Sequence, residues 1–211
     1  MTTQRLDIRA HINERKMSGY QWLLLVLCFL IVATDGMDVA IMGFLAPDIT
    51  REWGISKAAF GVVMSAAPIG LAIGALVVGP LSDRFGRKKL LVGSIALFGV
   101  FNLLSAFADG TATLSLLRFL TGLGLGAAMP STTTLLSEYV PERSRSMLLA
   151  TMFTGFNLGS ALVGFGAAAL LPHHGWRAVL IAGGAIPLIC LPFYIMLIPE
   201  SARFMVVRNI S

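Results

Sequence analysis

Charged residues are scarce in this chain. Asp, Glu, Lys and Arg make up 13% of its 211 residues, whereas roughly a quarter is usual in soluble domains, and hydrophobic residues make up 56%. A water-exposed surface needs more charged side chains than this. The composition therefore excludes an ordinary soluble domain and indicates a protein that lies in a lipid bilayer.

The chain also has few residues of the kinds that form metal or catalytic sites. Its two cysteines, Cys28 and Cys190, both lie in apolar runs, so neither a disulfide framework nor a metal site is predicted. No nucleophile stands with a base and no phosphate-binding loop is present, so we expect neither an enzyme nor a cofactor. The net charge is +5, but the cations are spread over short polar stretches, which argues against a nucleic-acid partner.

Long apolar runs dominate the chain instead. Six of them approach the roughly 20 residues that cross about 30 Å of hydrocarbon: 20–46, 58–80, 90–108, 112–136, 147–171 and 176–198. We predict an all-α membrane protein in which these six transmembrane helices form one bundle. Residues 1–19 form a polar segment before the bundle, and residues 199–211 begin a loop after it.

Lys and Arg are distributed unevenly between the two sides of this bundle. Twelve of the 16 cations fall on one side: Arg5, Arg9, Arg15, Lys16, Arg84, Arg87, Lys88, Lys89, Arg143, Arg145, Arg203 and Arg208. Arg51, Lys57 and Arg177 fall on the other side. Because cytoplasmic loops are rich in Lys and Arg, we expect both termini in the cytoplasm and the bundle in the cytoplasmic membrane.

The 22 glycines are concentrated in the apolar runs rather than in the connections. Pairs recur at a spacing of four residues: Gly70 and Gly74, Gly122 and Gly126, and Gly155 and Gly159. This spacing places small residues on one face of a helix, where two backbones can approach closely. We predict tight helix packing at these faces.

Three ionisable residues lie inside the predicted spans: Asp35, Asp38 and Arg118. An unpaired charge at the bilayer centre costs about 2.5–3.5 kcal/mol, so each should face a partner or a watery cavity. At 1.5 Å per residue, Asp35 lies roughly 20 Å above the start of the first span, and Arg118 lies roughly 9 Å below the outer end of the fourth. These depths nearly coincide, so Asp35 and Arg118 are predicted to approach each other, with Asp38 closer to the outer side.

Two interpretations of these charges remain open. Either Asp35 and Arg118 form a buried ion pair that only holds two helices together, or the charges line a translocation pathway. In the second case a carboxylate takes up the driving proton, and the guanidinium attracts an anionic substrate. Two roles remain open for Asn102, in the third span: a contact with the substrate, or a hydrogen bond to a neighbouring helix.

A dense run of charge, from Gly79 to Lys89, connects the second and third spans. It resembles the signature G-x-x-x-D-R-x-G-R-(R/K) of the major facilitator superfamily, and every fixed position is matched: Gly79, Asp83, Arg84, Gly86, Arg87 and Lys88. The resemblance implies a fold of two six-helix halves, each a 3+3 inverted repeat, with the substrate between them. It also implies that this chain is the amino-terminal half, truncated or encoded as a fragment, that its partner is a missing carboxy-terminal half, and that this loop governs conformational switching.

Two further runs are similar to one branch of this superfamily. The Asp-Gly-x-Asp sequence that begins at Asp35, and the run from Arg118 to Pro130, resemble the aromatic acid:proton symporters. The resemblance implies proton-coupled uptake of anionic aromatic substrates such as hydroxybenzoates, with the two aspartates and the arginine needed for uptake. A sugar or other metabolite symporter is the alternative, because the run from Pro199 to Phe204 is similar to the P-E-S-P-R of sugar porters. A non-transporting membrane fragment is a third possibility.

Charged residues also follow the fourth and sixth spans on the side expected to be cytoplasmic: Glu138, Glu142, Arg143, Arg145, Glu200 and Arg203. They form either a charge network between domains or a solvated surface. In the second case their ion pairs would contribute little stability, as is usual for pairs exposed to water.

Overall fold

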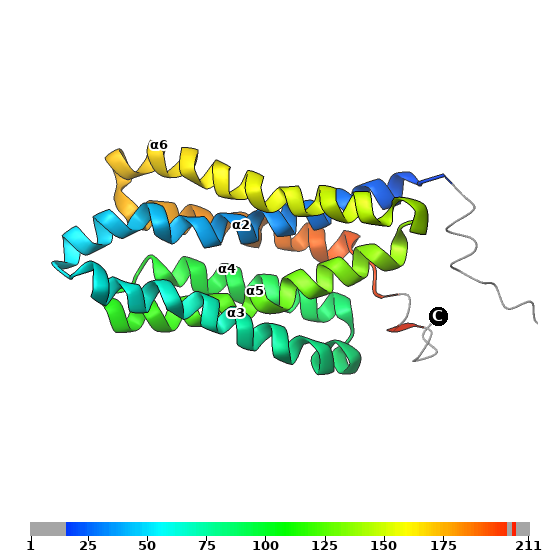
Figure 1. The fold of residues 1–211 in the computed structure, drawn as a ribbon, viewed down its shortest axis with the longest axis horizontal. Coiled ribbons are helices and arrows are strands. Elements are labelled where there is room, and N and C mark those ends of the chain that lie inside the picture. The colour runs from blue at the N-terminus through cyan, green and yellow to red at the C-terminus, as the bar shows by residue number, and fades with distance from the viewer. Residues whose placement is uncertain (1–15, 202–203, 206–211) are drawn as a thin grey trace, which may run out of the picture.

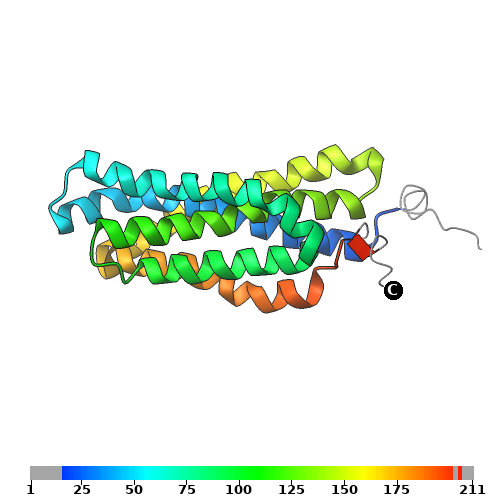
Figure 2. The same cartoon turned by 90° about the horizontal axis from the view of Figure 1, so that it is seen from below.

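The computed structural model describes residues 16–201 and 204–205, and this part of the chain is helical with no strand. It contains five long helices: α2 (Gly19–Trp53), α3 (Lys57–Phe85), α4 (Arg87–Ser105), α5 (Thr111–Tyr139) and α6 (Glu142–Leu197). They run along the long axis of an elongated bundle (Figure 1; Figure 2). All five are long and apolar enough to cross a membrane, judged by length and composition.

The six apolar segments of the sequence fall in five helices rather than six, because α6 contains the last two of them. This helix is 56 residues long, and within it Gly175 has the non-helical angles φ 71° and ψ 178°. The chain reverses direction in this region, so that the two arms of α6 run antiparallel (Figure 1). A positive φ is accessible to glycine at little cost, which allows the reversal without a separate loop.

The connection expected over residues 79–89 is mostly helical, which corrects the prediction of a loop. α3 continues to Phe85 and α4 begins at Arg87, so a single residue, Gly86, separates the two helices. Gly86 has φ 92°, and its N–H donates to the carbonyl oxygen of Ser82 at 3.0 Å. The charged run therefore comprises the last turns of α3, this glycine joint and the first turn of α4.

Glycine contacts hold the helices in pairs, as the four-residue spacing predicted. α2 packs mainly on α6 and α3 mainly on α5, while α4 contacts both α5 and α6. A Cβ atom added at Gly70 would meet the carbonyl oxygen of Phe119 across the α3–α5 contact, and one at Gly159 would meet that of Ala33 across the α2–α6 contact. The backbones approach too closely at these points for any side chain to fit between them.

The buried apolar residues form two clusters at different levels of the bundle. The described chain begins at Lys16 and ends at Met205 at one end, here called the terminal end (Figure 1; Figure 2). The cluster nearer that end includes Leu24, Cys28, Leu91, Leu135, Met152 and Tyr194. The second cluster, nearer the opposite end, includes Ile41, Leu45, Phe60, Leu114, Trp176 and Leu180.

Candidate functional site

A layer of buried polar side chains lies between these two apolar clusters. On α2 it falls between residues 24–32 of the first cluster and residues 41–49 of the second, and on α5 it falls between Leu114 and Ala128. We call it the polar layer and define it by five residues, each at most 4% exposed: Asp35, Asp38, Asn102, Arg118 and Thr121. α2, α4 and α5 each contribute to it.

Arg118 is the centre of the polar layer. Its side chain is fully buried, and its NH1 group donates to Asp38 Oδ1 at 2.9 Å, which forms a buried ion pair between α5 and α2. Its NH2 group donates to Asn102 Oδ1 at 2.8 Å and to Thr121 Oγ1 at 3.2 Å. The planar guanidinium is thereby held by partners from three helices, in a fork geometry that a lysine could not reproduce.

The sequence predicted that Arg118 approaches Asp35. The predicted partner is wrong, because the arginine pairs with Asp38 instead. The two aspartates are three residues apart, which is about 4.5 Å along the helix axis. The depth estimate rested on span ends that the sequence places only to within several residues. It could therefore locate the level of the charges but could not choose between two carboxylates less than one turn apart.

Three polar atoms of the polar layer lack a hydrogen-bond partner among the described residues: Asp35 Oδ1, Asn102 Nδ2 and Arg118 Nε. Buried polar atoms are nearly always hydrogen-bonded, and exceptions call for a functional explanation or a bound water. The layer thus offers one free acceptor and two free donors beside an ion pair. Such a set can accept a proton, a water molecule or part of a polar ligand.

Asn102 makes the contact with a neighbouring helix that the sequence offered as one of its two roles, since its Oδ1 accepts from Arg118, while its Nδ2 has no partner among the described residues. Thr121 was not singled out by the sequence interpretation. The signal was nonetheless present, because a residue three positions after Arg118 lies on the same helix face.

A second polar group lies at the terminal end, where the chain after α6 meets the α3–α4 joint. Arg87 Nε lies 3.7 Å from Glu138 Oε1, and the hydroxyl of Ser201 donates to Glu138 Oε2 at 2.7 Å. Glu200 Oε1 accepts the backbone N–H of Lys88 at 3.0 Å, so this carboxylate caps the start of α4. The space for it exists because Gly86 has no Cβ, since one would lie 2.6 Å from Glu200 Oε2.

The remaining members of the expected charge network are Glu142, Arg143, Arg145 and Arg203. Glu142 and Arg145 are 3.8 Å apart within the first turn of α6 and are substantially exposed, which fits the solvated surface. Arg143 is also exposed, and Arg203 lies outside the described residues. Of the motif residues on α3, the side chains of Asp83 and Arg84 are exposed and Gly79 lies on the surface.

The long apolar helices and the charges buried among them define a class, that of multi-pass membrane proteins. Residues 27–207 match the model of the Major Facilitator Superfamily, and the chain belongs to this superfamily. The inward-open structure of the xylose transporter XylE from E. coli has the same fold, with a TM-score of 0.77 and 22% identity. That match covers 90% of this chain and 50% of XylE.

Relatives of higher identity carry the names of aromatic acid transporters. The gallate transporter of Pseudomonas putida is 56% identical over 97% of this chain and 45% of its own length. The 4-hydroxybenzoate transporter PcaK of Pseudomonas aeruginosa is 55% identical over 98% of this chain and 46% of its own length. The chain therefore spans about half the length of these relatives.

Proposed function

We propose that this chain is the amino-terminal half of a carrier that takes up aromatic carboxylates together with protons across the cytoplasmic membrane. In this proposal α2 to α5 each cross the membrane once, and the two arms of α6 cross it separately, which makes six crossings. The terminal end faces the cytoplasm, because twelve of the 16 Lys and Arg belong to segments on that side. The partner is a carboxy-terminal six-helix half.

The buried pair of Arg118 and Asp38 is the observation that carries the proposal. In hydrocarbon neither charge is stable alone, so the guanidinium needs an anion at all times. When Asp38 takes up a proton it loses its negative charge, and Arg118 then lacks a counter-ion. The carboxylate of an incoming substrate can take that place through two parallel hydrogen bonds. Proton uptake and anion uptake are thereby linked.

Asp35 belongs to the same proton pathway in this proposal. It lies three residues before Asp38 on α2 and is 2% exposed, and its Oδ1 atom has no partner among the described residues. A proton that enters the layer therefore finds a second carboxylate near the ion pair. We assign Asp35 and Asp38 to proton transfer and Arg118 to the binding of the substrate anion.

The α3–α4 joint is the proposed switching element. The motif residues lie in or beside it: Gly79, Asp83, Arg84, Gly86, Arg87 and Lys88. Arg87 lies near Glu138 at the end of α5, and the N–H of Lys88 donates to Glu200, which follows α6. The joint lies at the terminal end, away from the polar layer, so it regulates the change between conformations and does not touch the substrate.

Aromatic carboxylates are the proposed substrates because relatives that match nearly the whole chain at 55–56% identity are named for gallate and 4-hydroxybenzoate. Both compounds carry the carboxylate that Arg118 would bind. A sugar symporter is the alternative. The likeness to XylE is at 22% identity, which supports the fold alone.

The test is an uptake measurement on an assembled carrier, in which this chain is joined to the carboxy-terminal half of the 4-hydroxybenzoate transporter PcaK of Pseudomonas aeruginosa. Cells that make it should accumulate radiolabelled 4-hydroxybenzoate, gallate should compete, and xylose should not. Competition by xylose would favour the sugar symporter. Absence of uptake from a carrier that is present in the membrane would favour a non-transporting fragment.

A further inference from the structure

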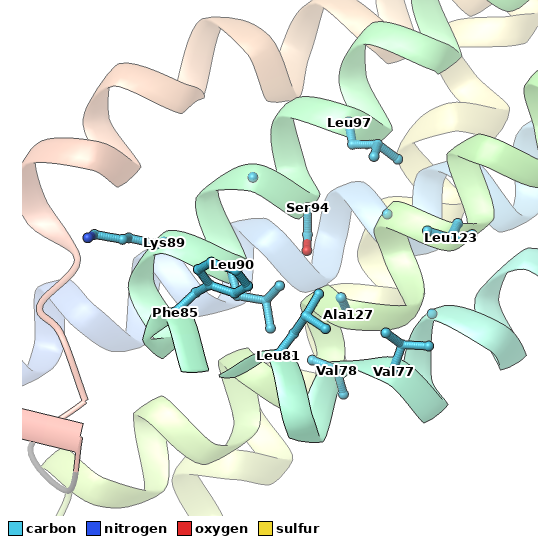
Figure 3. Close-up of a pocket in the computed structure, with 13 residues that line it drawn as sticks. Val77, Val78, Leu81, Phe85, Lys89, Leu90, Ser94, Leu97, Leu123 and Ala127 are labelled. Carbon is cyan, nitrogen blue, oxygen red and sulfur yellow. The ribbon is translucent and has the colours of Figure 1, made fainter. Parts of the chain in front are cut away.

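An apolar groove of about 440 Å³ opens between α3, α4 and α5, outside the polar layer (Figure 3). Its walls include Val77, Leu81, Phe85, Leu90, Leu97 and Leu123. Among the residues that the structure describes, Lys89 is the one charged residue that lines it, and Ser94 is the one lining residue with a hydroxyl group.

The groove has the length of one membrane leaflet. On α4 it extends from Lys89 to Leu97, about 12 Å along the helix, and on α3 from Phe85 to Gly74, about 16 Å. Half of the hydrocarbon core is about 15 Å thick. The groove therefore begins beside the α3–α4 joint and ends near the middle of the bilayer, in the membrane placement proposed above.

The mouth of the groove is positively charged. Lys89 projects away from the apolar wall there, with its ammonium group directed outward (Figure 3). Arg87 is paired with Glu138, and Arg84 stacks over the ring of Phe85. Within residues 16–201 and 204–205, the structure shows no ion pair for the ammonium group of Lys88 or of Lys89. The Lys89 ammonium group therefore places a positive charge at this end of the groove.

The groove is narrow and apolar, it is about as long as one leaflet is thick, and it has a cation at its mouth. These features suit a molecule with an apolar chain and an anionic headgroup. We propose that the groove binds an acyl chain of an anionic phospholipid, with the lipid phosphate on the Lys89 ammonium group. Basic pockets between helices on the cytoplasmic side are suited to anionic headgroups.

The probe is phosphatidylglycerol, compared with phosphatidylcholine of the same acyl chains, titrated onto the purified 211-residue chain and counted by native mass spectrometry. We expect one phosphatidylglycerol to bind more tightly than phosphatidylcholine. The Lys89→Gln variant should weaken phosphatidylglycerol binding about fivefold and leave phosphatidylcholine unchanged. Lys57→Gln, at the opposite end of α3, is the matched control and should change neither.

A second pair of variants tests the acyl chain separately from the headgroup. Gly93 lines the groove, and a Cβ added there would meet nothing within 4 Å, so Gly93→Leu is expected to place its side chain in space that the acyl chain would occupy. It should abolish the tight phosphatidylglycerol site, whereas Gly43→Leu, on α2 and equally open, should not.

Three results would overturn the proposal: equal affinity for the two lipids, tight binding that survives Gly93→Leu, or loss of the bound lipid when the carboxy-terminal half is joined. The last would mean that the second half, and not a lipid, covers the groove. Because lipid binding is measured without transport, failure of this proposal is distinguishable from failure of the proposed function.

Discussion

At the scale of single residues, the central feature is the way in which the polar layer neutralises the buried charge of Arg118. Arg118 is fully buried and has partners from α2, α4 and α5, so its charge is neutralised before any substrate arrives. In the proposed carrier, a substrate anion would therefore displace Asp38 rather than find a free guanidinium. This proposed exchange would couple anion uptake to proton uptake.

The two aspartates should differ in their effect on stability. Removing Asp38 leaves the guanidinium without its counter-ion, and breaking a buried pair in this way costs about 3–5 kcal/mol. Asp35→Ala removes a carboxylate that pairs with no cation in the described structure, and should cost much less. Thermal unfolding of Asp38→Ala and Asp35→Ala in the same detergent would compare them. Equal losses would show that Arg118 is shared between both aspartates.

Asn102 should stabilise the fold through its bond to Arg118. A hydrogen bond to a charged group contributes about 1.5–3 kcal/mol, so Asn102→Ala should lower the midpoint of thermal unfolding clearly. Asn157→Ala is the matched control, because Asn157 is an exposed asparagine on α6. This variant should have the same unfolding midpoint as the parent chain. A similar midpoint for both variants would argue against a structural role for Asn102.

The sequence was sufficient to predict that an aspartate of the first span approaches Arg118, since hydrocarbon penalises a lone charge. It was not sufficient to predict which aspartate binds the arginine. That choice depends on the rotation of α2 relative to α5, and helix rotation is set by side-chain packing that a depth count does not include.

At the scale of helices, glycines determine where two backbones touch. Gly159 faces the carbonyl oxygen of Ala33 across the α2–α6 contact, whereas a Cβ at Gly166, two turns further along α6, would meet nothing within 4 Å. The four-residue glycine pairs allowed this packing to be predicted. The ends of the helices could not be, because α2 continues through Pro47 to Trp53 and the charged run near Gly86 is helical.

Alanine substitutions at Gly159 and at Gly166 should change the stability of the chain in opposite directions. Gly159→Ala forces a methyl group against a backbone oxygen, and such overpacking costs about 1–3 kcal/mol. Gly166→Ala gains helix propensity of up to about 1 kcal/mol with no clash. Unfolding midpoints should fall for the first variant and rise slightly for the second. A rise for both would show that α2 and α6 do not pack this closely.

At the scale of the whole molecule, the chain is one helical unit of the Major Facilitator Superfamily whose described ends meet at one end of the bundle. Its class and superfamily could be predicted from the apolar runs and the charged motif, because both depend on local sequence. The reversal inside α6 could not, since it depends on the φ of one residue, Gly175. The specificity of a complete carrier depends on a second half as well.

The proposed orientation of the unit in the membrane rests on the distribution of its Lys and Arg residues. A single cysteine introduced at Thr2, in a chain without Cys28 and Cys190, should not react with an impermeant maleimide in intact cells, whereas one at Lys57 should react. Reaction at position 2 in intact cells would show that the terminal end faces outward.

The exchange of Asp38 for a substrate carboxylate on Arg118 is the central claim, and Asp38→Asn in the assembled carrier tests it most directly. The asparagine keeps an oxygen for the guanidinium but cannot take up and release a proton. Accumulation of 4-hydroxybenzoate driven by a pH gradient should be lost, while exchange of labelled for unlabelled substrate across the membrane should continue. Accumulation at the parental level by Asp38→Asn would contradict the account.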